Sequence, residues 1–298
     1  MAAKTEFEKY LAQKLKEDEG RLVPVKASTL ERMFVKKADI EKLHPNPEDE
    51  FCDPMIGPND KIISDYVQKI RNSATQNMEP WEEPLIVEKV HPDGYRLLNG
   101  HHRWAAALKT GYSPVKISIV NLTQATDIEH MIRISKHDKR VTLDLDELIF
   151  CDEGSGVPLE KALPFPANRI YKERMRLGIP ALLHFLGEQG YDIWVYSARY
   201  YSIEYIRNYF RRYSVKVDGI VTGAGRRMSK ERNELAKQTE KMITDQYGET
   251  LHIDRDLVLR TVRDTRTFKE YPVEAEPAAW SGAVVEIIKR LNRGEQEK

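Results

Sequence analysis

The sequence is poor in three features that would assign a class at once: cysteines, long apolar runs and an excess of one charge. Its 298 residues include two cysteines, Cys52 and Cys151, which lie far apart and match no disulfide framework or zinc-ligand spacing. No apolar run approaches the roughly 18 residues of a membrane-spanning helix. The N-terminal stretch MAAKTEFEKYLAQKLKEDEG is charged throughout and lacks the apolar centre of a secretory signal. We therefore expect a soluble, cytoplasmic protein with no membrane partner.

The charges balance, so that the formal net charge is zero. The balance holds on both sides of Arg140 and argues against duplex DNA as the main partner, because domains that bind DNA carry a positive excess. A local exception is the basic stretch from Arg199 to Arg232. This stretch is either a solvated helix face or a surface that favours a polyanion.

The length suits two domains better than one core. Strand-like and helix-like segments alternate after residue 138, as in VTLDLDELIFC, GIPALLHFLGEQG and YDIWVYSA, which predicts βαβ units around a parallel sheet. The fold class is therefore α/β, with a smaller α+β domain before the parallel-sheet domain. We divide the chain into a helical arm, a first domain, a linker helix and a second domain, at residues 1–29, 30–123, 124–138 and 139–298.

Carboxylates gather at the predicted strand ends of the second domain. Asp144 and Asp146 follow an apolar strand, at the edge of an α/β sheet where ligands bind. Two carboxylates this close repel unless a cation or a shared proton relieves them, although one of them could instead cap a following turn. Ser197 follows a second strand, and LHIDRD ends a third strand with Asp254 and Asp256.

The order acid pair, hydroxyl, lysine, acid pair resembles the haloacid dehalogenase superfamily of phosphotransferases, over roughly residues 140–291. The resemblance implies that Asp144 is a nucleophile forming an aspartyl-phosphate and that Asp146 is the general acid and base. It implies that Ser197 and Lys230 hold the phosphoryl group. It further implies a Mg²⁺ site that draws on four carboxylates, those of Asp144, Asp146, Asp254 and Asp256.

Two positions depart from that superfamily's pattern. Leu148 stands where Thr or Val is usual, and the last acidic pair has D-x-D spacing, which leaves open which of the two aspartates binds the metal. The short gaps between the motifs leave no room for a large cap domain. An uncapped crevice suits a bulky substrate, such as a nucleic-acid end or a phosphoprotein, or a site that the other domain covers. The phosphorylated substrate is left open as a small molecule, a nucleic-acid end or a phosphoprotein.

The stretch LLNGHHRWAAAL places Gly100, His101, His102 and Arg103 at a predicted strand-to-helix junction. Cations are normally disfavoured at the start of a helix, where the unpaired N–H groups are partly positive. An anion bound there would account for them, because glycine allows close approach and the cations act as co-binders. Alternatively, the histidines cap and pack while the arginine makes a surface ion pair.

The surrounding sequence over about residues 30–122 resembles the ParB/sulfiredoxin fold, whose free-serine kinases carry G-H-H-R at this turn. The resemblance implies that Gly100, His101, His102 and Arg103 contact the phosphates of ATP or another nucleotide. It also suggests Glu50, in the loop NPEDEFCDP, as a base, although this loop could equally be a solvated acidic turn. Trp81 and Trp104 either stack on a base or belong to the core.

The leading hypothesis is a two-domain phosphotransfer protein: a nucleotide-binding module, either a kinase or a sensor, joined to a Mg²⁺-dependent phosphomonoesterase. One alternative is a ParB-like, nucleotide-dependent DNA partition protein. Against it, α/β sequence follows where such proteins have a helix-turn-helix. A further alternative is a regulatory pseudoenzyme that binds nucleotide without turnover.

Overall fold

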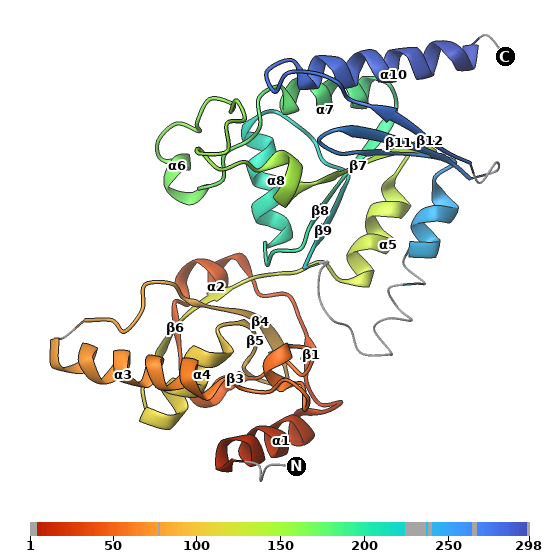
Figure 1. Ribbon diagram of the computed structural model, residues 1–298. Coiled ribbons are helices and arrows are strands. Elements are labelled where there is room, and N and C mark those ends of the chain that lie inside the picture. The colour runs from red at the N-terminus through yellow and green to blue at the C-terminus, as the bar shows by residue number, and fades with distance from the viewer. Residues whose placement is uncertain (1–4, 77, 224–236, 238–239, 264–266, 297–298) are drawn as a thin grey trace. The chain divides into compact units, whose positions relative to one another are not determined.

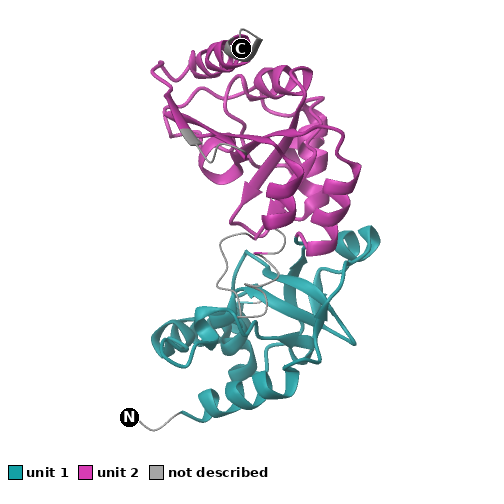
Figure 2. Ribbon diagram, turned by 90° about the vertical axis from the view of Figure 1, so that its right-hand side faces the viewer, with its two compact units in different colours: residues 1–122, 226–229 teal, residues 123–225, 230–298 magenta. Residues whose placement is uncertain are grey.

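The computed structural model describes residues 5–76, 78–223, 237, 240–263 and 267–296. The chain divides into two compact units, coloured separately in Figure 2. Unit 1 comprises residues 1–122 and 226–229, and unit 2 comprises residues 123–225 and 230–298. In the described part of the chain, no helix is both long and apolar enough to cross a membrane.

Unit 1 is built around a sheet with the strand order β2-β6-β4-β5-β3, and β1 pairs with β4 (Figure 1). Its elements are α1 (Glu6–Asp18), β1 (Val23–Pro24), α2 (Thr29–Phe34), β2 (Lys37–Ala38), η1 (Ile40–Lys42), β3 (Leu43–His44), η2 (Glu50–Cys52), α3 (Asp60–Gln76), β4 (Leu85–His91), β5 (Tyr95–Asn99), α4 (His101–Thr110) and β6 (Val115–Ile119).

The sequence explains how these elements begin and turn. Thr5 and Ser28 cap α1 and α2 in capping boxes with the glutamates three residues later. The predicted HPDG turn joins β4 to β5 as an antiparallel hairpin. The predicted helical arm packs on this unit, because Leu11 of α1 is buried in its core.

Unit 2 is an α/β sheet with the strand order β12-β11-β10-β7-β8-β9. A helix over residues 240–246 precedes β10. The other elements are α5 (Ala125–Ile134), β7 (Lys139–Asp144), η3 (Leu145–Ile149, a turn of π-helix), α6 (Ala167–Ile170), α7 (Ile179–Glu188), β8 (Tyr191–Ser197), α8 (Ile203–Arg212), β9 (Gly219–Thr222), β10 (Glu249–Ile253), β11 (Leu257–Val262), β12 (Thr267–Pro272) and α10 (Trp280–Gln296).

The sheet of unit 2 is only partly parallel. Strands β9, β8, β7 and β10 are parallel, as predicted, whereas β11 and β12 add to β10 as an antiparallel meander. The chain reverses directly after β10, where the N–H of Asp254 donates to the carbonyl of Leu257 at 2.8 Å. The predicted strands are therefore parallel, and the sheet continues beyond them as an unpredicted antiparallel pair, because a tight turn replaces the crossover helix that a further parallel strand would need.

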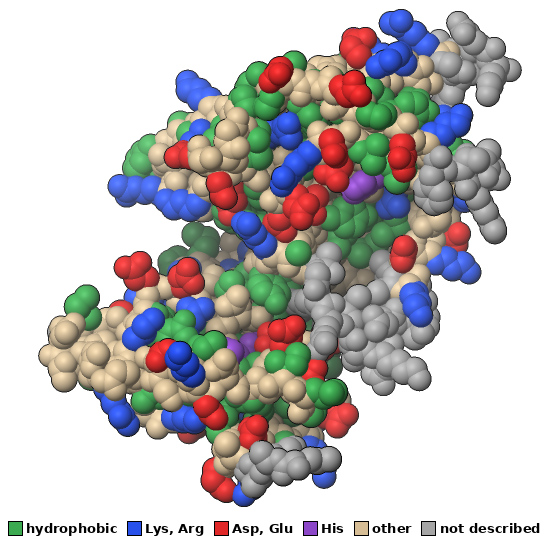
Figure 3. All heavy atoms as spheres, in the orientation of Figure 1, with side chains coloured by type: hydrophobic (Ala, Val, Ile, Leu, Met, Phe, Trp, Pro, Cys, Tyr) green, Lys and Arg blue, Asp and Glu red, His purple; other side chains and the backbone are tan. Residues whose placement is uncertain are grey.

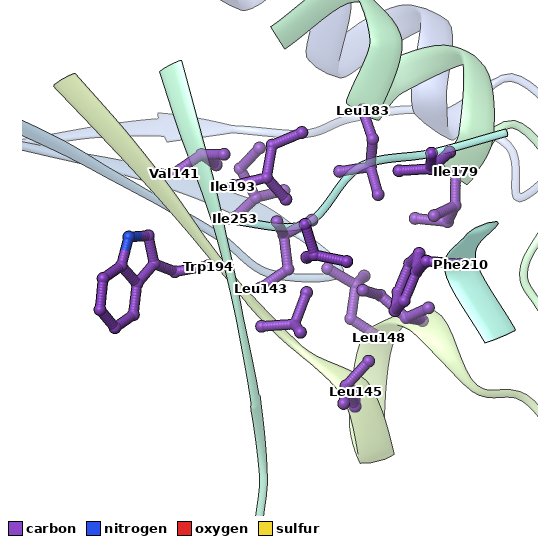
Figure 4. Packing of buried hydrophobic residues seen from close by; sticks show 14 of the residues in the cluster. Val141, Leu143, Leu145, Leu148, Ile179, Leu183, Ile193, Trp194, Phe210 and Ile253 are labelled. Atoms are coloured by element: carbon purple, nitrogen blue, oxygen red, sulfur yellow. The ribbon is translucent and has the colours of Figure 1, made fainter. Parts of the chain in front are cut away.

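Helices cover both faces of the unit 2 sheet. Figure 4 shows Trp194 on the opposite side of the strands from Ile179 and Leu183 of α7 and Phe210 of α8. The Trp194 indole donates to the hydroxyl of Tyr247, which follows the helix over residues 240–246. The core is therefore two apolar layers separated by the sheet, as expected for an α/β fold.

Helix α5 belongs to unit 2 by its contacts. Its residues Ile128 and Met131 are buried in the unit 2 core. Just before the helix, the Thr123 hydroxyl donates to the carbonyl of Ile220 in β9 at 2.9 Å and accepts from the N–H of Thr222 at 3.0 Å. The segment that we treated as a linker helix is thus packed on the edge of the second sheet.

Candidate functional site

The carboxyl end of β7 carries the first acid pair. The Oδ1 atom of Asp144 accepts hydrogen bonds from the backbone N–H groups of Asp146 and Glu147, each at 2.7 Å. Asp144 therefore caps the short turn η3 that follows, which is the role we had left open as the alternative. Only one of its two oxygens is used in this way.

Asp146 points to the neighbouring strand β8. Both of its carboxylate oxygens lie 2.9 Å from the Ser197 hydroxyl, and Oδ2 accepts from the Ala198 N–H at 2.8 Å. The guanidinium of Arg199 lies 3.6 Å from Oδ1. The end of β8 thus presents a hydroxyl, a backbone N–H and a cation to one carboxylate, so it is built to receive an anion.

Strand β10 brings Asp254 to the other side of β7. In the parallel register Leu143 pairs with Ile253, so Asp144 and Asp254 are the next residues on adjacent strands. The chain runs from β7 to β8 and β9 on one side and returns as β10 on the other. Strand order therefore reverses at β7 and β10, and such a switch point is where open α/β sheets bind their ligands.

The predicted four-carboxylate metal set is not assembled. Among the residues that the structure describes, no three His, Cys, Asp or Glu side chains are placed to hold a metal ion together. Asp146 is engaged by Ser197 and Ala198, and Asp256 is exposed in the turn after β10. This corrects the prediction of one metal site formed by all four aspartates.

A metal site with two carboxylates would need fewer protein ligands. Mg²⁺ usually keeps several waters and is held by one or two carboxylates together with substrate oxygens. Asp144 and Asp254 supply such a pair at adjacent strand ends. The predicted Lys230 lies outside the described residues.

Helix α4 starts at Gly100 in unit 1, as the sequence predicted. Gly100 has φ 99° and gives α4 no side-chain cap. A Cβ atom at this position would lie 2.4 Å from Leu85 Cδ2, so the backbone needs a glycine here for both conformation and space. The first N–H groups of α4 have no intrahelical acceptor, since the N–H of Trp104 is the one that bonds back to the Gly100 carbonyl.

The two histidines after Gly100 fasten an acidic loop to the helix. Nε2 of His101 accepts from the N–H of Asn46, and Nε2 of His102 accepts from the N–H of Asn59. Burial lowers the pKa of both rings, that of His101 to about 4. Burial thus favours the neutral form of both rings, and each Nε2 already accepts a hydrogen bond, which argues against the cationic role that the sequence suggested.

Arg103 is also occupied within unit 1. Its guanidinium, in a residue only 7% exposed, donates to the carbonyl of Glu83 at 2.6 Å and to Asn99 at 3.4 Å. Trp104 is buried in the core, and Trp81 packs edge-on against Tyr66. Phosphate contact at this turn therefore remains a prediction, and it depends on the backbone N–H groups of α4 more than on the side chains.

The acidic loop contacts α4 through Asp49. Its Oδ2 lies 3.3 Å from Nδ1 of His101, whereas the predicted base, Glu50, is exposed. The Phe51 ring covers both histidines, stacked on His101 and edge-on to His102. Asp49 belongs to the acidic run in NPEDEFCDP, and nothing in such a run shows which residue faces the helix.

The family comparison covers this part of the chain. A model of the ParB N-terminal domain matches residues 25–135. Residues 25–135 form a ParB N-terminal domain. This match indicates a nucleotide- or DNA-related function, and it extends through α5, which packs in unit 2. No curated protein and no solved structure matches the chain.

The ParB N-terminal match spans residues 25–135, less than half of the chain. The function of unit 2 must therefore be argued from its own geometry. Figure 3 shows acidic and basic side chains intermixed on the visible faces of both units, in keeping with the balanced net charge.

Proposed function

We propose that the protein is a two-domain phosphoryl-transfer protein, in which unit 2 hydrolyses a phosphomonoester at the carboxyl ends of β7, β8 and β10. The observation that carries this proposal is the acid pair Asp144 and Asp146 at the point where strand order reverses, with Asp146 held by the donors of Ser197 and Ala198. The resemblance to the haloacid dehalogenase superfamily supports it.

In this proposal Asp144 Oδ2 attacks the phosphorus atom, and the bond from phosphorus to the ester oxygen breaks. Asp146 donates a proton to the leaving oxygen and later removes one from the water that hydrolyses the aspartyl-phosphate. Ser197 Oγ and the Ala198 N–H transfer their hydrogen bonds from Asp146 to a phosphoryl oxygen. Mg²⁺ held by Asp144 and Asp254 would screen the approach of two anions.

Phosphate release tests this proposal. Asp144→Asn removes the nucleophile, yet its amide oxygen still accepts the two N–H bonds that cap η3, so the fold is kept. We expect phosphate release from a panel of phosphomonoesters with Mg²⁺ to fall about 10³-fold or more. Asp245→Asn, at an exposed position in the helix over residues 240–246, is the matched control and should leave the rate unchanged.

Two results would contradict the phosphatase proposal. One is a wild-type protein that is inert towards the whole panel, and the other is equal activity in wild type and Asp144→Asn. A wild-type protein that is stabilised by nucleotide but releases no phosphate would point to the regulatory pseudoenzyme instead.

We also propose that unit 1 binds a nucleotide through its phosphates at the start of α4. The ParB N-terminal match supports this, as do the uncapped N–H groups after Gly100. ATP or CTP should slow amide hydrogen exchange at residues 101–103 and bind more tightly than the nucleoside. Gly100→Ala should abolish binding.

Gly111→Ala is the matched control for nucleotide binding. Gly111 ends the same helix with φ 69° and open space around it, so the substitution strains the backbone without touching the first turn. Equal loss of affinity in both variants, or no exchange protection at residues 101–103, would contradict the assignment. If the protein retards one DNA duplex sequence in a gel more than random DNA, and nucleotide gives no exchange protection at residues 101–103, a partition protein is favoured.

A further inference from the structure

The aromatic side chains beside Asp146 form an ordered stack that the proposed chemistry does not use. The rings of Tyr201 and Tyr205 are nearly parallel, 5.8 Å apart at 7°. Tyr205 in turn packs on Tyr171 at 4.9 Å, and Phe150 meets Tyr201 edge-on at 5.9 Å. Among the described residues, no ring contact beyond these two involves Tyr201, so it is the end of the stack.

Hydrogen bonds from the tyrosine hydroxyl groups hold the stack in place. The Tyr205 hydroxyl bonds to the carboxylate of Glu173 and to the carbonyl of Ile170, and the Tyr209 hydroxyl bonds to the carbonyl of Glu173 at 3.2 Å. These bonds join α8 to the segment between η3 and α7. The rings are therefore held in place before any ligand arrives, which lowers the entropy cost of binding against them.

Tyr201 lies beside the reacting groups. The N–H of Tyr201 donates to the Arg199 carbonyl at 3.1 Å, and Nε of Arg199 lies 3.6 Å from Oδ1 of Asp146. The Arg199 side chain is 63% exposed, so this end of β8 opens to solvent. Burial raises the pKa of the Tyr201 hydroxyl to about 12, which keeps the ring uncharged.

We propose that Tyr201 is a specificity-determining residue that selects phosphate esters whose alcohol carries a flat aromatic ring. The ester's ring packs on the exposed part of the half-buried Tyr201 ring, while its phosphoryl group takes the donors of Ser197 and Ala198. The inference rests on the proposed phosphatase function and adds the substrate class to it.

The test compares three esters: a nucleoside 5′-monophosphate, phenyl phosphate and glycerol 1-phosphate. Stacking on an aromatic side chain is worth roughly tenfold or more in binding. We expect wild type to favour the two aromatic esters about tenfold in kcat/KM, and Tyr201→Ala to lower kcat/KM for these two esters about tenfold relative to glycerol 1-phosphate. Tyr201→Phe keeps the ring and should keep the preference.

Tyr213→Ala is the matched control, because Tyr213 is a half-buried tyrosine at the far end of α8. It should leave the preference intact. If the nucleoside and phenyl esters are hydrolysed at equal rates, the protein recognises the aromatic ring alone. If the nucleoside ester is hydrolysed faster, the site is specific for nucleotides. Either outcome supports the inference.

The inference is overturned if wild type shows no preference, or if Tyr201→Ala slows all three esters equally. Equilibrium binding of two unreactive ligands, phenylphosphonate and methylphosphonate, separates failure of the phosphatase proposal from failure of this inference. If no ester is hydrolysed, calorimetry should still give about tenfold tighter binding of phenylphosphonate in wild type and not in Tyr201→Ala. Equal affinities for the two phosphonates would overturn the inference independently of turnover.

Discussion

His101 was predicted to contact phosphate, but in the structure it joins α4 to a neighbouring loop. Its position after Gly100 suggested a cation beside a phosphate, but its ring is buried, neutral and bonded to the Asn46 N–H. Sequence alone shows the junction and the glycine. The sequence does not show that the His101 ring is buried, because this burial depends on Phe51, which stacks on the ring from another loop.

The depressed pKa of His101 makes the stability of unit 1 dependent on pH. Above about pH 6.5 the ring is neutral in both folded and unfolded chains. As the pH falls from about 6.5 to about 4, the unfolded chain binds a proton at His101 while the folded chain does not, so stability falls. A shift of this size corresponds to a loss on the order of 3 kcal/mol.

Urea unfolding between pH 7 and 4 tests this, with the exchange of α4 amides as the reporter of unit 1. His101→Gln removes the titrating group and should flatten the decline. The same pH dependence in both proteins would contradict the assignment.

At the scale of elements, the predicted strands VTLDLDELIFC and YDIWVYSA and the helix GIPALLHFLGEQG between them correspond to β7, β8 and α7, because apolar periodicity and glycine boundaries mark them. The antiparallel β11 and β12 were not predicted. The acidic turn between β10 and β11 looked like a ligand set, and its role as a hairpin turn depends on the bond from Asp254 to Leu257.

Strand β9 is positioned by a close contact between its first residue and Trp194. A Cβ atom on Gly219 would lie 2.0 Å from the Trp194 indole, so Gly219→Ala forces the ring or the strand to move. We expect a loss of about 1–3 kcal/mol in the free energy of unfolding. Tryptophan fluorescence during urea unfolding measures it.

Gly187→Ala is the matched control for Gly219→Ala. Gly187 lies within α7 with open space around it, and alanine there should raise stability by about 0.5–1 kcal/mol through helix propensity. Equal effects at the two glycines would show that the contact with Trp194 is unimportant.

At the scale of the whole molecule, the main segment of unit 1 ends at Leu122, next to the predicted end of the first domain at residue 123, and the helix that we expected as a linker belongs to unit 2. The change from loop-rich to alternating sequence near residue 138 is real, but α5 packs before it, with unit 2. A short amphipathic helix between two domains shows an apolar face, and its sequence cannot show which core buries that face.

Two substitutions in α5 test this placement. Met131→Ala opens a cavity in the unit 2 core and should lower its stability by about 2–5 kcal/mol, without changing amide exchange in α4. Ile134, on the same helix, is exposed, so Ile134→Ala should have little effect. If α5 were only a linker, both substitutions would have a similar effect on the free energy of unfolding. Urea unfolding of the two variants measures that effect.

The bonds from Thr123 to β9 have a consequence for how the protein behaves in a crowded solution. Strand β9 is an outer strand of its sheet, and outer strands are where foreign strands add and aggregation begins. Thr123 occupies the carbonyl of Ile220 and the N–H of Thr222, two groups that an incoming strand would need. The chain's own connection thus shields the sheet from unwanted self-association.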